Sequence, residues 1–322
     1  MKINRIRVSA IGNKVNLIFF FLLTSIVFFS GCSQAPSLKT SGKYYTLEYT
    51  PSGESEELQI PVTYTLWVPT KAKTIRGVIV HQHGAGILAS EQGAAAATDL
   101  HWQALAKKWD CALLGSSYHV SNDATDKTSG GSELWFDPRN GSDQAFQNAL
   151  AQFAKQTDHP EITKAPWVFW GHSGGGIWSD VMSSLHPERV AAMWLRSGSA
   201  TNRINFPQLE ISKAVYQIPI MGNAGIKEKG RGAYDGPLAK FHAYRAKGAP
   251  IGFAPDPRTG HECGDSRYLA IPYLDACMAL RLPDKNSTNQ TLKTINVNEA
   301  WFGSLKDSVA VPAKEFKGNP VD

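Results

Sequence analysis

The sequence predicts an α/β protein with a mostly parallel central sheet and helices on both faces of that sheet. Short apolar runs rich in β-branched and aromatic residues recur along the chain and fit buried strands. Stretches with apolar residues at helical spacing lie between them, and this alternation is typical of strands joined by crossover helices. About 290 residues remain once an N-terminal targeting segment is set aside, which suits one such domain with a large core.

The first half of the chain supplies the opening strands. Segments 44–49 and 62–68 look extended and partly antiparallel. The apolar run at 77–80 predicts a buried strand, apolar residues at helical spacing predict a helix over 102–109, and the next strand is expected at 111–114.

The second half continues the alternation. A helical stripe over 146–153 precedes the apolar, aromatic strand at 167–170. Further elements are expected as strands at 190–195, 218–221 and 251–254 and as a surface helix at 238–247.

Two long segments lack clear periodicity. Segments 119–140 and 198–217 leave the carboxyl ends of strands, where open α/β sheets bind ligands, so we expect both to shape a substrate site. The tail from about Pro283 is polar apart from Trp301 and Phe302.

Residues 1–31 have the layout of an export signal, with a basic head that lacks acidic residues and an apolar run at 15–29. The run is short for a membrane span. The sequence around Cys32 resembles a bacterial lipobox, which implies lipidation of that cysteine. We expect an exported bacterial lipoprotein held at a membrane, periplasmic or on the cell surface, with 32–40 as a tether before a domain at 41–322 that includes the C-terminal tail. A plain cleaved signal, giving a secreted protein, is the alternative.

The charge of the mature chain gives no reason to expect a nucleic-acid partner, and none is expected. The full chain carries 33 basic and 28 acidic side chains, and four of the basic ones lie in the signal. The remainder is close to neutral, so the composition does not indicate nucleic-acid binding.

The segment Gly171-His172-Ser173-Gly174-Gly175 carries the chemistry. It follows the apolar run at 167–170 and precedes apolar residues at helical spacing, so Ser173 sits where a buried strand turns sharply into a helix. A serine hydroxyl is a poor nucleophile unless it is exposed, aimed and close to a base, and glycines on either side permit the strained turn. We therefore predict that Ser173 is a nucleophile.

A serine nucleophile needs a histidine base. Three histidines follow Ser173. We call the turn at Ser173 the elbow and the helix after it the elbow helix. His186 precedes a proline at the far end of the elbow helix, and His242 lies inside the expected surface helix. His261 lies in the Gly/Pro-rich loop after the last strand, where the base belongs.

The acid that orients the histidine is expected on a loop after a late strand. Glu228 is the first carboxylate after the strand at 218–221 and is the favoured choice. Asp235, Asp256 and Asp265 remain open as alternatives.

Backbone N–H groups are expected to hold the developing oxyanion. One donor should be Gly174, directly after the nucleophile, and the other should be Ala85, with Gly86 as second choice, on the loop after the first buried strand. His83 is expected to support that loop. His81 and His83 lack an acidic or cysteine partner for a metal site, so no metal or cofactor is expected.

Together these motifs resemble the α/β-hydrolase superfamily, in particular its serine esterases. The match covers an H-G-x-G loop at 83–86, the G-H-S-G-G elbow, a late acid and a G-H pair at 260–261, and 260–270 looks like the histidine-bearing end of secreted esterases and polyhydroxybutyrate-depolymerase-like proteins. The resemblance implies the α/β-hydrolase fold, a Ser-His-acid triad, an acyl-enzyme route, and a small-molecule or polymeric ester as substrate. A glutamate stands where aspartate is commoner, and the oligomeric state stays open.

Two other functions remain open: a serine peptidase of the same fold, and a catalytically inactive binding lipoprotein. The ester's acyl and alcohol groups are also open, because the aromatic residues near the motifs fit either a binding site or the core. These residues are Trp135, Phe136, Trp178 and Trp194.

Three cysteines follow the signal. An oxidising compartment permits one disulfide, and we expect Cys263 to pair with Cys277 because the bond would brace the loop beside His261. Cys111 lies in an apolar run and is expected to be a buried thiol.

Overall fold

The structure is a computed structural model of the whole chain. The residues it describes are 41–51, 57–86, 92–120, 135–201, 209–285, 287, 291–303 and 309–317. The expected export signal, the tether and Cys32 lie outside the described residues. Within the described part of the chain, no helix is both long and apolar enough to cross a membrane.

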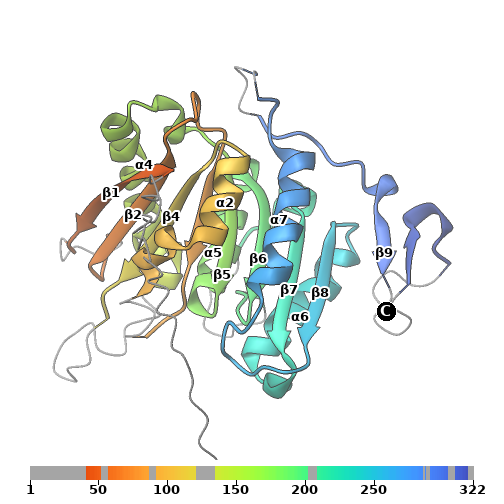
Figure 1. Cartoon of the computed structure of the whole chain (residues 1–322). Coiled ribbons are helices and arrows are strands. Elements are labelled where there is room, and N and C mark those ends of the chain that lie inside the picture. Colours follow the sequence, from red (N-terminus) through yellow and green to blue (C-terminus); the bar gives the residue numbers. More distant parts are fainter. Residues whose placement is uncertain are drawn as a thin grey trace, which may run out of the picture. The chain divides into compact units, whose positions relative to one another are not determined.

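An eight-stranded, mostly parallel sheet forms the centre of the fold (Figure 1), in the order β1-β2-β4-β3-β5-β6-β7-β8. β1 pairs with β2 and β2 with β4 in antiparallel register, and every later pairing is parallel. The strands are β1 (Gly42–Tyr49), β2 (Val62–Pro69), β3 (Val78–Gln82), β4 (Ala112–Tyr118), β5 (Trp167–His172), β6 (Val190–Arg196), β7 (Ile220–Gly225) and β8 (Ile251–Asp256). The predicted α/β class with a mostly parallel sheet is confirmed.

Helices cover both faces of the sheet. α2 and α7 pack on one face around Trp102, Leu274 and Met278, whereas α4 and α5 pack on the other around Phe146 and Trp178. α6 packs against β7 and β8. Within the described residues, the α-helices are α2 (Leu100–Lys108), α4 (Ser142–Thr157), α5 (Gly174–Leu185), α6 (Gly232–Arg245) and α7 (Arg267–Arg281).

The central strand β5 shows why the sheet is buried on both sides. Trp167 and Phe169 face the α4/α5 core, and Val168 and Trp170 face the α2/α7 core. Alternate side chains of a strand point to opposite faces, so a fully apolar strand needs cover on each. A buried tryptophan of this kind contributes roughly 4–6 kcal/mol before entropy costs.

Several details differ from the sequence expectations. The sequence reading did not predict α7, which contains Pro272. β7 begins at Ile220, because Ile218 caps a preceding 3₁₀ turn. In the tail, β9 (Trp301–Gly303) and β10 (Ala310–Pro312) form a separate two-stranded sheet.

Candidate active site

Ser173 occupies a strained turn between β5 and α5. Its backbone adopts φ 53° and ψ −119°, a conformation that non-glycine residues rarely take. A Cβ added at Gly171 would lie 2.4 Å from the carbonyl oxygen of Gly175, and one added at Gly175 would lie 2.3 Å from that of Gln82. Glycine is therefore required on both sides, and the serine is held at the carboxyl edge of the sheet.

A continuous hydrogen-bond chain joins three of the predicted site residues. The Ser173 hydroxyl lies 2.8 Å from Nε2 of His261, and Nδ1 of His261 lies 2.5 Å from Oε1 of Glu228. The other carboxylate oxygen of Glu228 accepts a hydrogen bond from the Ser197 hydroxyl at 2.8 Å. Glu228 is only 3% exposed, so this carboxylate is held away from solvent with both oxygens occupied. An imidazole held this way presents Nε2 to the serine as an acceptor.

The other candidate acids lie elsewhere. Asp235 accepts a hydrogen bond from the backbone of Gly230, Asp256 accepts one from the backbone of Arg258, and Asp265 pairs with the Arg258 side chain. Glu228 follows β7 directly in a single 3₁₀ turn, and this short connection points its side chain at the loop after β8.

The remaining late histidines are not at the elbow. His186 caps the opposite end of α5 and bonds Asp143 at 2.8 Å. His242 lies on α6 with its ring against Phe241. Of the three histidines after Ser173, the structure brings His261 to the serine.

The expected oxyanion donors come from two adjoining backbone segments. A Cβ added at Gly174 would lie 3.3 Å from the backbone nitrogen of Ala85 and 3.0 Å from the ring of Phe136. Among the described residues, the N–H groups of Ala85 and Gly174 have no acceptor. Gly86 follows with φ 102°, which only glycine adopts readily. The arrangement leaves two amide donors beside the serine for a negatively charged oxygen.

Two side chains, the buried Arg196 and the partly buried His172, hold the loop that carries His261, and neither role is predicted from the sequence. Arg196, 0% exposed at the end of β6, donates to the carbonyl oxygen of Gly260 at 3.2 Å and to that of Glu262 at 2.6 Å. His172, at the end of β5, donates from Nε2 to the carbonyl oxygen of His261 at 2.6 Å. Three successive carbonyl groups are thus fixed by side chains at the ends of two neighbouring strands.

The two side chains that hold this loop differ in charge: His172 is neutral and Arg196 is positively charged. Burial lowers the pKa of His172 to about 4, so this imidazole is neutral at physiological pH. Burial also lowers the pKa of Arg196, but an arginine stays charged in any case. Arg196 also donates to Asn223 at 2.9 Å and to the Thr259 hydroxyl at 2.7 Å, so its charge is spread over several acceptors.

A buried ion pair joins the elbow helix, α5, to α6. Nζ of Lys240 on α6 lies 2.5 Å from Oδ1 of Asp180 on α5, and both side chains are fully enclosed. Oδ2 of Asp180 accepts from the Ser199 hydroxyl at 2.6 Å and from the backbone of Ala200 at 2.9 Å. The pair therefore ties the elbow helix to α6 and to the loop after β6. Removing either partner would leave a buried charge, at a cost of about 3–5 kcal/mol.

The expected disulfide is wrong: Cys263 and Cys277 are both free. Cys263 is on the loop before α7, whereas Cys277 lies ten residues into that helix. Ten residues of α-helix span about 15 Å, and a disulfide needs Cα atoms within about 7 Å. Burial raises the pKa of Cys263 to about 11 and that of Cys277 to about 12, so both are thiols at neutral pH. Cys111 is free and buried.

The aromatic and histidine candidates take different positions. Trp135, Trp178 and Trp194 belong to the buried cores, although the neighbouring Phe136 ring covers Gly174. The rings of His81 and His83 lie 4.9 Å apart in an aromatic cluster. In the part of the chain that the structure describes, no group of three or more His, Cys, Asp or Glu side chains could hold a metal ion.

No known family profile matches the sequence, and neither does any curated protein. The fold is similar to solved esterases and hydrolases at low identity. A poly(aspartic acid) hydrolase-1 from Sphingomonas sp. KT-1 is 16% identical with a TM-score of 0.48, covering 71% of this chain and 97% of that chain. A ferulic acid esterase is 12% identical with a TM-score of 0.48, covering 74% and 98%.

A third similar structure is an S-formylglutathione hydrolase from Agrobacterium tumefaciens, 15% identical with a TM-score of 0.47, covering 74% of this chain and 94% of that chain. The similarity concerns the fold alone. The chain's own strand order, the crossover helices on both faces and the sharp strand-to-helix turn at Ser173 give it the α/β-hydrolase fold.

Proposed function

We propose that this protein is a serine hydrolase that cleaves carboxylic esters through an acyl-enzyme. The observation that carries the proposal is the unbroken chain from the Ser173 hydroxyl through His261 to the buried Glu228 carboxylate. Two amide N–H groups beside the serine supply the second requirement of acyl transfer, which is a site for negative charge.

In the first half of the reaction, the Ser173 oxygen attacks the ester carbonyl carbon while Nε2 of His261 takes the hydroxyl proton. The carbonyl oxygen becomes an oxyanion held by the N–H groups of Ala85 and Gly174. Glu228 stabilises the imidazolium that forms. The tetrahedral intermediate then collapses, the bond from carbon to the alkoxy oxygen breaks, and His261 gives its proton to the leaving alcohol.

In the second half, water repeats the sequence on the acyl-enzyme. His261 takes a proton from water, the hydroxide attacks the acyl carbon, and the new oxyanion occupies the same two N–H groups. Collapse releases the carboxylic acid, and His261 returns the proton to the Ser173 oxygen. Each group is restored, so the cycle consumes only ester and water.

Hydrolysis of matched substrates tests the proposal. We expect wild-type protein to hydrolyse p-nitrophenyl acetate and to hydrolyse the matched anilide far more slowly. Ser173→Ala should lose nearly all turnover. Ser184→Ala is the matched control, because its hydroxyl lies near the other end of α5 and only bonds the carbonyl of Asp180. Retained turnover in Ser173→Ala would exclude the nucleophile, and faster cleavage of the anilide would favour a peptidase.

We also propose that the protein is exported and anchored by lipid at Cys32, as the resemblance of its N-terminal sequence to a lipobox suggests. Expressed in a bacterium with labelled palmitate, the wild-type chain should carry label and sediment with membranes. Cys32→Ser should abolish the label. A labelled Cys32→Ser chain, or an unlabelled wild-type chain, would contradict the anchor.

A further inference from the structure

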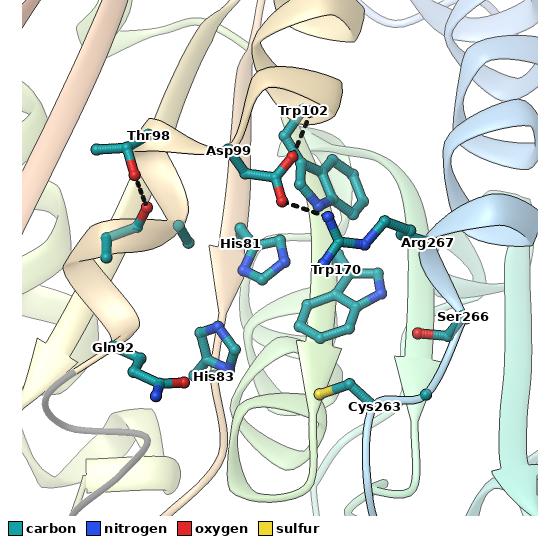
Figure 2. Close-up of a pocket in the computed structure, with 13 residues that line it drawn as sticks. His81, His83, Gln92, Thr98, Asp99, Trp102, Trp170, Cys263, Ser266 and Arg267 are labelled. Carbon is teal, nitrogen blue, oxygen red and sulfur yellow. Dashed lines mark hydrogen bonds and ion pairs between the residues drawn. The ribbon is translucent and has the colours of Figure 1, made fainter. Parts of the chain in front are cut away.

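A cavity of about 360 Å³ lies on the sheet face covered by α2 and α7, and its lining includes residues that neighbour the candidate active-site segments in the chain. Its lining includes His81 and His83 from the end of β3, Asp99 from the cap of α2, and Cys263 and Arg267 from the region after His261. Figure 2 shows the pair of Asp99 and Arg267 at one end and His83 with Cys263 at the other. The volume is in the range of small-molecule sites.

The position of the cavity relates it to the leaving group of an ester. Its wall contains Cys263 and Gly264, which follow His261 on the same loop, and His83, which precedes Gly84. A Cβ added at Gly84 would lie 2.9 Å from Cβ of Ser173, so the residue that follows His83 packs against the nucleophile. His261 must hand its proton to the leaving oxygen, so the alcohol lies on the histidine side of the reacting carbon.

One lining side chain has unused hydrogen-bonding capacity. His81 is only 7% exposed, and its Nδ1 is buried without a partner among the described residues. Its ring stacks on Trp170, with centroids 4.1 Å apart, so the ring is fixed in place. Native proteins rarely leave a buried polar group unpaired. Nδ1 of His81 has almost no accessible surface, so a ligand with several hydroxyl groups would bond instead to polar lining side chains such as Gln92 and Thr98.

The lining carries no net charge at neutral pH. Arg267 is paired with Asp99 at 2.6 Å. Burial lowers the pKa of His81 and His83, so both rings are neutral, and the high pKa of Cys263 keeps it a thiol. An anionic ligand would lack a free counter-charge here, and a purely apolar ligand would leave the polar edges unpaired. An uncharged ligand with many hydroxyl groups fits both conditions.

We propose that this cavity binds the alcohol part of the ester substrate and that this alcohol is an uncharged, polyhydroxylated ring such as a sugar. The inference rests on the proposed esterase function and adds the substrate class.

Binding to the Ser173→Ala protein tests the inference without requiring turnover. We would titrate it with methyl glucoside, methyl glucuronide and cyclohexanemethanol by calorimetry and saturation-transfer NMR. The glucoside should bind at least tenfold more tightly than either the anionic ring or the apolar ring. Equal or tighter binding of the glucuronide or of cyclohexanemethanol, or no binding of the glucoside, would overturn the proposal.

Variants then place the binding in this cavity. In the Ser173→Ala background, Arg267→Met and Thr98→Val should each weaken glucoside binding at least fivefold, since both residues line the cavity. Arg258→Met is the matched control: it removes the same charge from the nearby loop, but its side chain is largely exposed and does not line the cavity. Equal weakening by the control, or none by both cavity variants, would contradict the assignment.

Hydrolysis by the enzyme with Ser173 intact distinguishes failure of the sugar site from failure of the esterase proposal. Arg267→Met should lower kcat/KM for an O-acetylated methyl glucoside at least tenfold relative to kcat/KM for p-nitrophenyl acetate. An unchanged ratio with Ser173-dependent hydrolysis overturns the sugar site and leaves the esterase proposal standing. Hydrolysis that does not depend on Ser173 overturns the esterase proposal itself.

Discussion

His172 donates a hydrogen bond from Nε2 to the backbone carbonyl of His261, over 2.6 Å. His172 directly precedes the candidate nucleophile, so the residue beside the serine holds the main chain of the candidate base. This hydrogen bond therefore couples the position of the elbow to the position of the histidine loop. Because reactive geometry must be kept within fractions of an ångström, this contact should matter for rate more than for stability.

Replacing His172 should lower activity through the position of His261. We expect His172→Phe to lower kcat/KM for p-nitrophenyl acetate about 10- to 100-fold, since the carbonyl of His261 loses its donor. His172→Gln keeps an N–H donor on a side chain of similar reach and should recover part of the loss. Equal losses in the two variants would mean that the ring fills space and does not position the base.

The stability of the protein should depend on pH through His172. Burial lowers its pKa to about 4 in the folded chain, against 6.5 for the free side chain, so the unfolded chain binds the proton first as pH falls. The contribution of His172 to the free energy of unfolding should therefore be fully present above about pH 6.5. It should decline by up to about 3 kcal/mol between pH 6.5 and 4. His81 and His83 act in the same direction.

Urea unfolding at several pH values measures this dependence. The wild-type free energy of unfolding should decrease from pH 7 to pH 4.5, and His172→Phe should show a shallower decrease because one of the depressed imidazoles is gone. Parallel curves for the two proteins would show that His172 titrates normally in the folded state.

Arg196 should be needed for both the loop and the fold. Arg196→Met removes the donors of the carbonyl groups of Gly260 and Glu262 and leaves them to find other partners. We expect a loss of about 2–4 kcal/mol in unfolding free energy together with a fall in kcat. Arg196→Lys keeps the charge but not the fork of donors, so it should restore stability more than kcat. Full activity in Arg196→Met would contradict the positioning role.

Comparing the loss of kcat in Glu228→Gln with that in Asp256→Asn tests whether Glu228 is the acid of the triad. Glu228→Gln should lower kcat about 10²- to 10⁴-fold, because a neutral amide cannot stabilise the imidazolium and favours the wrong tautomer. Asp256→Asn is the control, since Asp256 is on the same loop as His261 but bonds the backbone of Arg258. A large loss in Asp256→Asn with a small one in Glu228→Gln would reverse the assignment.

The sheet and the elbow could be predicted from the sequence because their signals are local. Gly171 and Gly175 are required by close contacts within the turn, and the apolar run of β5 needs cover on both faces. The order of the later strands then selected Glu228 and His261, which the structure brings together. The proline inside α7 obscured a helical apolar pattern that is otherwise present at Ala270 and Leu274.

Other features depend on tertiary contacts that one sequence does not reveal. Arg196 at the end of a strand looks like a solvated charge, and nothing in the sequence shows that it is enclosed by backbone carbonyl groups. His172 occupies the variable position of its motif, so its spacing carries no signal. The disulfide expectation failed because the sequence distance between Cys263 and Cys277 hides a rise of several helical turns.

Covalent labelling shows whether the Ser173 hydroxyl is an activated nucleophile. A fluorophosphonate should add one phosphonyl group per chain, and peptide mass spectrometry should place it on Ser173; His261→Ala should label far more slowly. A folded chain that stays unlabelled, or that carries the label on another serine, would contradict the role of Ser173 as the nucleophile.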